Sequence, residues 1–178
     1  MGAPGDSDLI ARARAGDKNA FEQLLRPMVA PAARLAYGML QDRAAAEDVV
    51  QEAALKAWRR LRSLRPGSDF GPWFLGIAAN QCRSLRRTRW WSVLRFEQVH
   101  SPAAQGTEDA TVRGADMRRA LQRLPDGQRA AILLHFYLDL PLETVAAVLG
   151  ISVSGAKSRV NRALKRMRRG LDSYEVVM

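Results

Sequence analysis

Two amphipathic segments separated by Gly150, within residues 140–169, restrict the fold more than any other feature of this sequence. Apolar residues recur at helical spacing before the glycine, which stands where a left-handed helix cap is expected. Ser152 then offers an N-cap oxygen for a second helix. A short helix, a glycine turn and a second helix are typical of a helix-turn-helix.

The second of these helices has an apolar side and a cationic side. Placed at about 100° per residue, its apolar residues share one arc: Val153, Val160, Ala163, Leu164, Met167 and Leu171. The rest of the surface carries seven cations and three small polar residues: Lys157, Arg159, Arg162, Lys165, Arg166, Arg168, Arg169, Ser154, Ser158 and Asn161. The second helix of a helix-turn-helix enters the DNA major groove. The alternative is a cationic face that only contacts water.

The charge balance supports a polyanionic partner. The 178 residues carry a net charge of +10, which favours nucleic acid first and an acidic membrane surface second. Cys82 is the only cysteine, so a reducing compartment fits best. The amino terminus lacks the pattern of a secretory signal, and no apolar run is long enough to span a bilayer. We therefore predict a cytoplasmic protein that does not insert into membranes.

Strand signals are nearly absent, and the sequence predicts an all-α fold. In the first half, we expect a helix over residues 7–15 and another that Asp17 caps and that ends near Pro27. A third helix follows Pro31, Asp42 caps a fourth, and a fifth has Pro72 in its first turn.

The fourth helix presents an acidic side within a basic protein. Opposite its apolar stripe lie Asp48, Gln51, Glu52, Leu55 and Arg59. One interpretation is solubility together with favourable charge near the helix N-terminus. The other is a docking face for a partner, because interfaces place a polar rim around an apolar anchor. Periodicity alone leaves both open.

Residues 62–71 form a loop with proline, glycine and serine, and the fifth helix follows it. One face of that helix carries four polar residues: Asn80, Arg83, Ser84 and Arg87. The same stretch of sequence also contains Arg86, Arg89, Trp90 and Trp91. Cations hold phosphates and aromatic rings stack on bases, so this pattern is typical of single-stranded nucleic-acid binding. Alternatively, Trp90 and Trp91 close the core of the first half.

The helical pattern stops at about residue 92 and resumes near residue 115. Residues 117–124 and 127–140 then predict two further helices around a turn at residues 125–127. We therefore predict two small helical domains, residues 1–91 and 115–178, joined by a flexible linker over residues 92–114.

No catalytic constellation, metal site or cofactor site is predicted. The two histidines, His100 and His135, do not pair with Cys82 or with a serine. Glu47, Asp48 and Glu52 lie along one helix without a histidine, which makes a metal site there a weak hypothesis. The sequence indicates binding and not turnover.

Several motifs together resemble one protein family. Residues 42–52 and 57–58 are similar to region two of the bacterial extracytoplasmic-function (ECF) sigma factors. Residues 73–80, with Arg86 and Arg87, resemble the promoter-melting part of that region. Residues 121–128 and 140–169 resemble region four. The resemblance implies a sigma region two bundle, a sigma region four helix-turn-helix and a role in transcription initiation.

By position, the resemblance also implies sites and partners. The face that docks on core RNA polymerase would contain Asp48, Gln51, Glu52 and Leu55. The surface for the minus-ten element of promoter DNA would contain Arg62, Arg65, Ser68, Asp69, Phe70, Trp73, Asn80, Arg83, Ser84 and Arg87. The surface for the minus-thirty-five element would contain Ser152, Ser154, Gly155, Lys157, Ser158, Arg159, Asn161, Arg162 and Arg166. An anti-sigma factor is a further implied partner.

Two other functions compete with this one. A DNA-binding regulator that uses only the carboxy-terminal helix-turn-helix would bind duplex DNA tightly without polymerase, at symmetric half-sites. A nucleic-acid enzyme is disfavoured because the sequence lacks a catalytic constellation.

Overall fold

The computed structural model describes residues 6–95 and 112–175, and this part of the chain is helical, which confirms the predicted all-α class. The first half contains α1 (Asp6–Arg14), α2 (Lys18–Leu40), α3 (Arg43–Arg60), the short 3-10 helix η1 (Leu61–Ser63) and α4 (Phe70–Arg95). The second half contains α5 (Val112–Gln122), α6 (Asp126–Ile132), the π-helical segment η2 (Leu133–Tyr137), α7 (Leu142–Leu149) and α8 (Val153–Glu175). Within the described ranges, no helix has both the length and the apolarity needed to cross a membrane.

The predicted aspartate caps of α2 and α3 are confirmed. The Asp17 Oδ1 atom accepts hydrogen bonds from the backbone N–H groups of Asn19 at 2.9 Å and Ala20 at 3.1 Å. Bonds to these amides and to Arg12 favour the carboxylate and lower the pKa of Asp17. Asp42 accepts from the Ala45 N–H at 3.0 Å in the same way. Both helices therefore begin where local capping chemistry places them.

The predicted break in α2 is wrong: the helix continues through Pro27 and Pro31. Each internal proline removes a backbone N–H and costs about 3 kcal/mol. Pro27 lies on the exposed side, where a carbonyl without a helical partner can bind water. The opposite side of the helix is buried and contains Ala20, Phe21, Leu24, Ala32, Leu35, Ala36 and Met39. Burial of this apolar side keeps the two segments in one helix.

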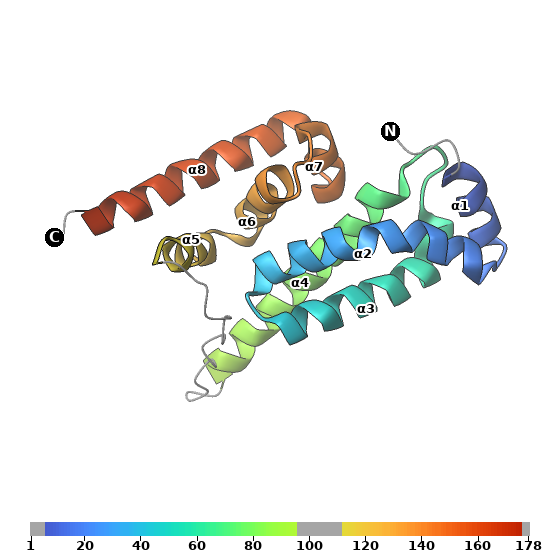
Figure 1. Ribbon diagram of the computed structural model, residues 1–178, viewed down its shortest axis with the longest axis horizontal. Helices are drawn as coiled ribbons and strands as arrows, with labels where there is room; N and C mark the ends of the chain where they lie inside the picture. The colour runs from blue at the N-terminus through green and yellow to red at the C-terminus, as the bar shows by residue number, and fades with distance from the viewer. Residues whose placement is uncertain (1–5, 96–111, 176–178) are drawn as a thin grey trace.

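The first half is a bundle in which α2, α3 and α4 lie side by side, with α1 across one end (Figure 1). Aromatic rings fill that end of the core: the Phe21 ring centroid lies 5.1 Å from that of Trp58 and 6.0 Å from that of Phe70. Phe70 also stacks on Phe74 at 5.8 Å. These contacts fix the start of α4 against α2 and α3.

In the second half, α6 and α7 lie between α8 and the bundle (Figure 1). The predicted long apolar helix is interrupted, because α6 ends at Ile132 and the π-helical segment η2 begins at Leu133. Most of the predicted turn at residues 125–127 is the first turn of α6. The predicted helix-turn-helix is present, with α7 ending at Gly150 and α8 starting at Val153. Val153 is 43% exposed and Ala156 is buried, so the apolar arc of α8 begins at Ala156.

Gly150 has the predicted left-handed conformation, with φ of 63° and ψ of 41°. A side chain at such a position costs about 1–2 kcal/mol. We expect Gly150→Ala to lower the free energy of unfolding by about that amount, measured by urea denaturation. Ala147→Gly, which changes an exposed helical position, is the comparison for ordinary helix propensity. Equal stability of the Gly150→Ala variant and the wild type would contradict the positive φ.

The two halves share one hydrophobic core. Buried residues of α2 and α4 belong to the same cluster as those of α6, α7 and α8. Residues 92–95 belong to α4 and residues 112–114 to α5, so both helices extend into the predicted linker. Residues 96–111 of that linker lie outside the described part of the chain.

Candidate nucleic-acid and protein interfaces

The candidate docking face lies on the outer side of α3. Its members are spaced three or four residues apart, which places them on one face of the helix. Asp48, Gln51 and Leu55 are exposed, and the Leu55 side chain is 51% accessible. Glu52 is half-buried and pairs with Lys56, whose Nζ lies 3.6 Å from the Glu52 Oε1 atom. The face thus joins polar and acidic side chains to an exposed apolar residue, Leu55.

The loop between η1 and α4 exposes part of the candidate minus-ten surface. Arg62, Arg65 and Ser68 are exposed, and Asp69 is half-buried. The loop starts from a fixed point, because the Arg14 guanidinium donates to the carbonyls of Leu61 and Leu64. Cations on this loop can reach a phosphate backbone.

Phe70 corrects the predicted site. The sequence placed it in a loop that faces DNA, but it is the first residue of α4 and only 1% exposed. Its ring packs among Phe21, Phe74 and Trp73, with a centroid distance of 5.9 Å to Trp73. Trp73 is half-buried. Phe70 is therefore a core residue that supports the loop.

Further along α4, polar side chains continue the candidate minus-ten surface. Asn80, Ser84 and Arg87 are exposed and Arg83 is half-buried. The Arg83 guanidinium donates to the Asn80 side-chain oxygen, so the two form one polar unit. The side chains of Trp90 and Trp91 lie outside the described part of the chain, and their two predicted roles stay open.

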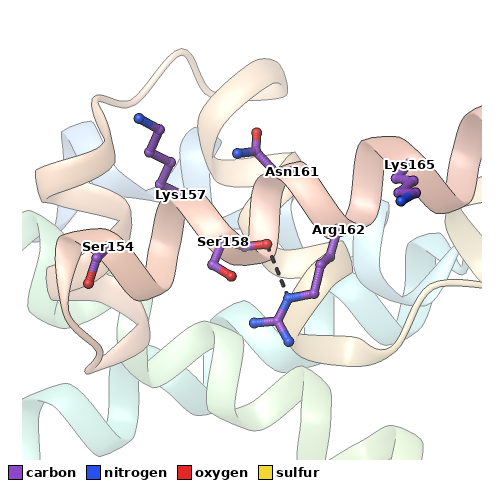
Figure 2. Close-up of a pocket in the computed structure, with 6 residues that line it drawn as sticks. All are labelled: Ser154, Lys157, Ser158, Asn161, Arg162 and Lys165. Carbon is purple, nitrogen blue, oxygen red and sulfur yellow. Dashed lines mark hydrogen bonds between the residues drawn. The ribbon is translucent and has the colours of Figure 1, made fainter.

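The cationic side of α8 forms the clearest polar surface. A shallow hollow of about 360 Å³ is lined by Ser154, Lys157, Ser158, Asn161, Arg162 and Lys165. Figure 2 shows these side chains spaced along the helix, where the Arg162 Nε atom donates to the Ser158 carbonyl at 3.2 Å. Lys165 lines the hollow although the sequence did not place it in the site. Lysine, arginine, asparagine and serine are the residue types that contact phosphates and base edges.

Three predicted residues of this surface differ from the rest. Ser152 is the N-cap of α8, since its Oγ accepts from the Gly155 N–H at 3.1 Å. Gly155 is half-buried against that cap. Arg159 is half-buried and points toward α6. Its Nη1 atom would lie 3.0 Å from a Cβ atom built on Gly127 of that helix. Arg166 is exposed. The open cationic surface is therefore centred on Lys157, Arg162 and Lys165.

Sequence reasoning missed Arg129, which is fully buried on α6. Its Nε atom donates to the Leu121 carbonyl at 2.7 Å, and its Nη2 atom donates to the carbonyls of Gln122 and Leu124. Its Nη1 atom reaches the Met39 carbonyl of α2 at 2.9 Å. An arginine beside a long apolar run was the available signal, because a buried charge requires partners.

An exposed aromatic group between α2 and η2 was also missed. Phe136 is 58% exposed, Tyr137 is 50% exposed and Tyr37 is 38% exposed. The Arg34 guanidinium carbon lies 5.6 Å from the centroid of the Tyr137 ring, within cation–π range. The apolar run in this part of the sequence predicted a buried helix, but Phe136 and Tyr137 lie on the π-helical segment η2 and are exposed.

Reactive and metal-binding groups do not gather in the described ranges. No group of three or more histidine, cysteine, aspartate or glutamate residues there could hold a metal ion, and this includes the weak candidates Glu47, Asp48 and Glu52. Cys82 is buried, and burial raises the pKa of its thiol to about 12. The His135 Nδ1 atom donates a hydrogen bond to the Leu140 carbonyl at 2.8 Å, as expected for a boundary histidine.

Comparison with known proteins identifies the family. Residues 21–92 match sigma-70 region 2, and residues 115–167 match sigma-70, region 4. The chain is 34% identical over 165 residues to the ECF RNA polymerase sigma factor SigM of Mycobacterium tuberculosis (strain ATCC 25618 / H37Rv), covering 92% of this chain and 83% of SigM. The chain belongs to the ECF sigma factors. As a member of this family, it is a transcription initiation factor that binds core RNA polymerase and promoter DNA.

Two solved structures resemble this ECF sigma factor over most of its length. One is CnrH in complex with the cytosolic domain of CnrY, with a TM-score of 0.72 and 28% identity over 95% of this chain and 98% of that one. The other is RpoE from Bartonella quintana in complex with the anti-sigma factor NepR, with a TM-score of 0.69 and 29% identity over 85% and 96%. Both neighbours were solved in complex with a second protein or protein domain.

Proposed function

We propose that this ECF sigma factor directs core RNA polymerase to promoters through three separate surfaces. The outer side of α3 docks on the polymerase, the loop after η1 with the outer side of α4 binds the minus-ten element, and α8 reads the minus-thirty-five element. The observation that carries the proposal is that one chain exposes an acidic face with a leucine anchor and, separately, a cationic face. Residues 1–91 and 115–178 would be the two functional domains.

Docking through α3 follows from the chemistry of that face. Leu55 offers an exposed apolar anchor, and Asp48 with Gln51 supplies a polar rim. Energetic anchors of interfaces have this arrangement, with an apolar centre that excludes water and a rim that sets specificity. A basic surface on the polymerase would complement it.

Strand separation would depend on the first half. Unpairing costs a few kcal/mol per base, and contacts with an extruded base and its backbone offset that cost. Arg62 and Arg65 on the loop, with Arg87 on α4, supply cations for the backbone. Trp73, half-buried on Phe70, supplies an aromatic edge for stacking.

Reading of the upstream element by α8 gives a salt-dependent prediction. We expect Arg162→Gln to weaken binding of the holoenzyme to promoter duplex and to reduce the slope of log K against log salt concentration by about 0.9, the value for one lost phosphate contact. The measurement is fluorescence anisotropy across a salt series. Arg26→Gln removes the same charge from an exposed site on α2 and should leave the slope unchanged. Equal slopes for wild type and Arg162→Gln would contradict the placement of Arg162 on DNA.

Control by an anti-sigma partner is part of the proposal, since two sigma factors of similar structure were solved with such partners or protein domains. The protein would act in the cytoplasm together with the polymerase. Its role would be binding and positioning, and the chemical step of RNA synthesis would remain with the core enzyme.

Reconstituted transcription tests the proposed function. Purified protein is added to sigma-free core polymerase with a library of promoter fragments, and transcripts are sequenced from their 5′ ends. We expect transcripts that start at a fixed distance from a shared pair of sequence elements. Absence of promoter-dependent transcripts, with protein that is folded by circular dichroism, would refute the proposal. Tight duplex binding without polymerase would support the DNA-binding regulator instead.

A further inference from the structure

Helix α1 contributes no residue to the three surfaces of the proposed function, yet it is bonded to one of them. Arg14, the last residue of α1, is half-buried. Its Nε atom donates to the Leu61 carbonyl at 3.3 Å, and its Nη2 atom donates to the Leu64 carbonyl. These carbonyls lie at the start of the segment that carries Arg62 and Arg65. We call residues 61–69 the capture loop.

Side chains at the start of the capture loop divide between the core and the solvent. Leu61 is 2% exposed and Leu64 is 3% exposed, whereas Arg62 and Arg65 are exposed. Burial of the leucines favours a backbone with the arginines outward, but the hydrophobic effect is non-directional. Hydrogen bonds have preferred distances and angles. The bonds from Arg14 therefore restrain the backbone in a way that leucine burial alone does not.

A tight turn restrains the middle of the capture loop. The Ser68 N–H donates to the Arg65 carbonyl at 3.1 Å, across Pro66 and Gly67. Gly67 has a φ of 75°. Proline at the second position and a positive φ at the third are typical of a type II turn. The loop then meets Phe70, which is buried among aromatic rings. The loop is thus held at its beginning, its middle and its end.

Arg14 supplies the restraint that comes from another part of the chain, 47 residues before Leu61. The helix that carries it is itself well anchored. Ile10 and Ala13 of α1 are buried, and the Arg12 Nη2 atom lies 2.7 Å from the Asp17 Oδ2 atom. The same aspartate caps α2 through its other oxygen atom. Arg14 therefore reaches the loop from a helix that is fixed on the bundle.

Order in the capture loop has a direct consequence for DNA binding. A flexible loop that becomes ordered on binding loses conformational entropy, and this loss weakens the complex. An unpaired DNA strand is flexible as well, so it cannot impose a conformation on the protein without a similar loss. A loop that is already ordered presents Arg62 and Arg65 at a fixed spacing and avoids its share of the loss.

We propose that Arg14 is a positioning residue for promoter DNA: it holds the capture loop in the conformation that binds the unpaired minus-ten strand, and it does not itself contact the strand. The DNA part of this inference rests on the proposed function. Without the Arg14 bonds, the loop has the binding conformation in only a fraction of molecules. The affinity for the strand falls by that fraction, about tenfold if one molecule in ten is competent.

Amide exchange in the free protein tests loop order without DNA. The amides of Leu64 and Ser68 are both hydrogen-bonded inside the capture loop. We expect Arg14→Met to make at least one of them exchange more than about tenfold faster by NMR, because local opening becomes more frequent. The Ala53 amide in the buried middle of α3 should exchange as in the wild type. Wild-type rates at both loop amides would overturn the proposal.

Arg12→Met is the matched control, because it removes an arginine from the same helix that pairs with Asp17 and not with the loop. It should leave both loop amides at wild-type rates. Equal acceleration by Arg12→Met and Arg14→Met would show that the docking of α1, and not Arg14, orders the loop. Arg14→Lys keeps the charge but not the planar fork of donors, so its rates should be intermediate. It replaces Arg14→Met in the test if that variant does not fold.

Strand binding tests the positioning role. The probe is a single-stranded non-template oligonucleotide that spans the minus-ten element of a promoter found by reconstituted transcription, and the protein is the holoenzyme. We expect Arg14→Met to bind about tenfold more weakly at every salt concentration, if one molecule in ten is competent. The slope of log K against log salt concentration should stay at the wild-type value, because no phosphate contact is lost. Arg12→Met should bind as the wild type does.

The salt slope separates positioning from contact. Loss of a direct phosphate contact reduces the slope by about 0.7 on single-stranded DNA, which is the result expected for Arg65→Gln. The same reduction for Arg14→Met would overturn the positioning role, and so would wild-type affinity in a variant whose loop amides exchange faster. Wild-type holoenzyme that does not bind the strand would instead refute the proposed function. Amide exchange would still decide whether Arg14 orders the loop.

Discussion

Replacing Arg129 by methionine should lower the free energy of unfolding by about 3 kcal/mol, because four backbone carbonyls lose a charged donor together. The guanidinium bonds the end of α5 at Leu121 and Gln122, Leu124 just after that helix, and the end of α2 at Met39. Methionine fills similar space but donates no hydrogen bond. For a chain of this length, the expected fall in Tm is about 6–12 °C, measured by calorimetry.

Arg26→Met is the matched control, because the Arg26 side chain is 80% exposed and its ion pair with Glu22 lies at the surface. Its effect should stay within about 0.5 kcal/mol. Arg129→Lys should fall between the two variants, since an ammonium keeps the charge but cannot reach every carbonyl. Equal Tm values for Arg129→Met and Arg26→Met would show that the hydrogen bonds of the buried guanidinium do not stabilise the fold.

Leu55→Asp should weaken binding to core polymerase by about 30-fold, the effect of losing an apolar anchor worth about 2 kcal/mol. Leu55 is 51% exposed on the outer side of α3, so an added carboxylate should not disturb the fold. The substitution removes apolar contact and adds a buried charge at the interface. Competition against labelled wild-type protein on core polymerase measures the loss.

Val29→Asp gives the comparison for Leu55→Asp. Val29 is 42% exposed on α2, away from the docking face, and the same carboxylate there should leave polymerase binding unchanged. Both variants should keep the wild-type Tm within a few degrees, since they alter exposed positions. Similar binding losses for both variants would place the anchor elsewhere on the protein.

Helix starts and ends were predictable because they depend on neighbours in the sequence. Asp17, Asp42 and Ser152 cap helices through bonds that reach only two or three residues along the chain. Gly150 ends α7 for an equally local reason. The continuity of α2 was not predictable in this way, because burial against α3 and α4 outweighs the local cost of Pro27 and Pro31.

The candidate surfaces were predictable as faces of helices, but not residue by residue. Helical spacing placed Asp48 and Leu55 on one exposed side of α3, and Lys157 and Arg162 on one exposed side of α8. Phe70 was misplaced because the loop composition around it concealed a contact with Phe21. Such a contact joins residues far apart in the sequence, and no local pattern records it.

Contact between the halves was the least predictable feature. A composition change near residue 92 indicates a boundary, but it does not say whether two domains touch. Gly38 and Gly76 were the available signals, because glycine inside a helical pattern often has a packing reason. Their partners, Leu133 and Val148, could be identified only in the folded chain.

Strand opening at a promoter is the most direct test of the proposed function. A promoter chosen by reconstituted transcription is treated with permanganate, which oxidises thymines that are not base-paired. We expect reactive thymines in the minus-ten element with core polymerase and the wild-type protein, and none with core polymerase alone. Leu55→Asp should give clearly weaker reactivity at a concentration just sufficient to saturate with the wild type. Wild-type holoenzyme that occupies the promoter and leaves every thymine protected would contradict the assignment of strand opening to this protein.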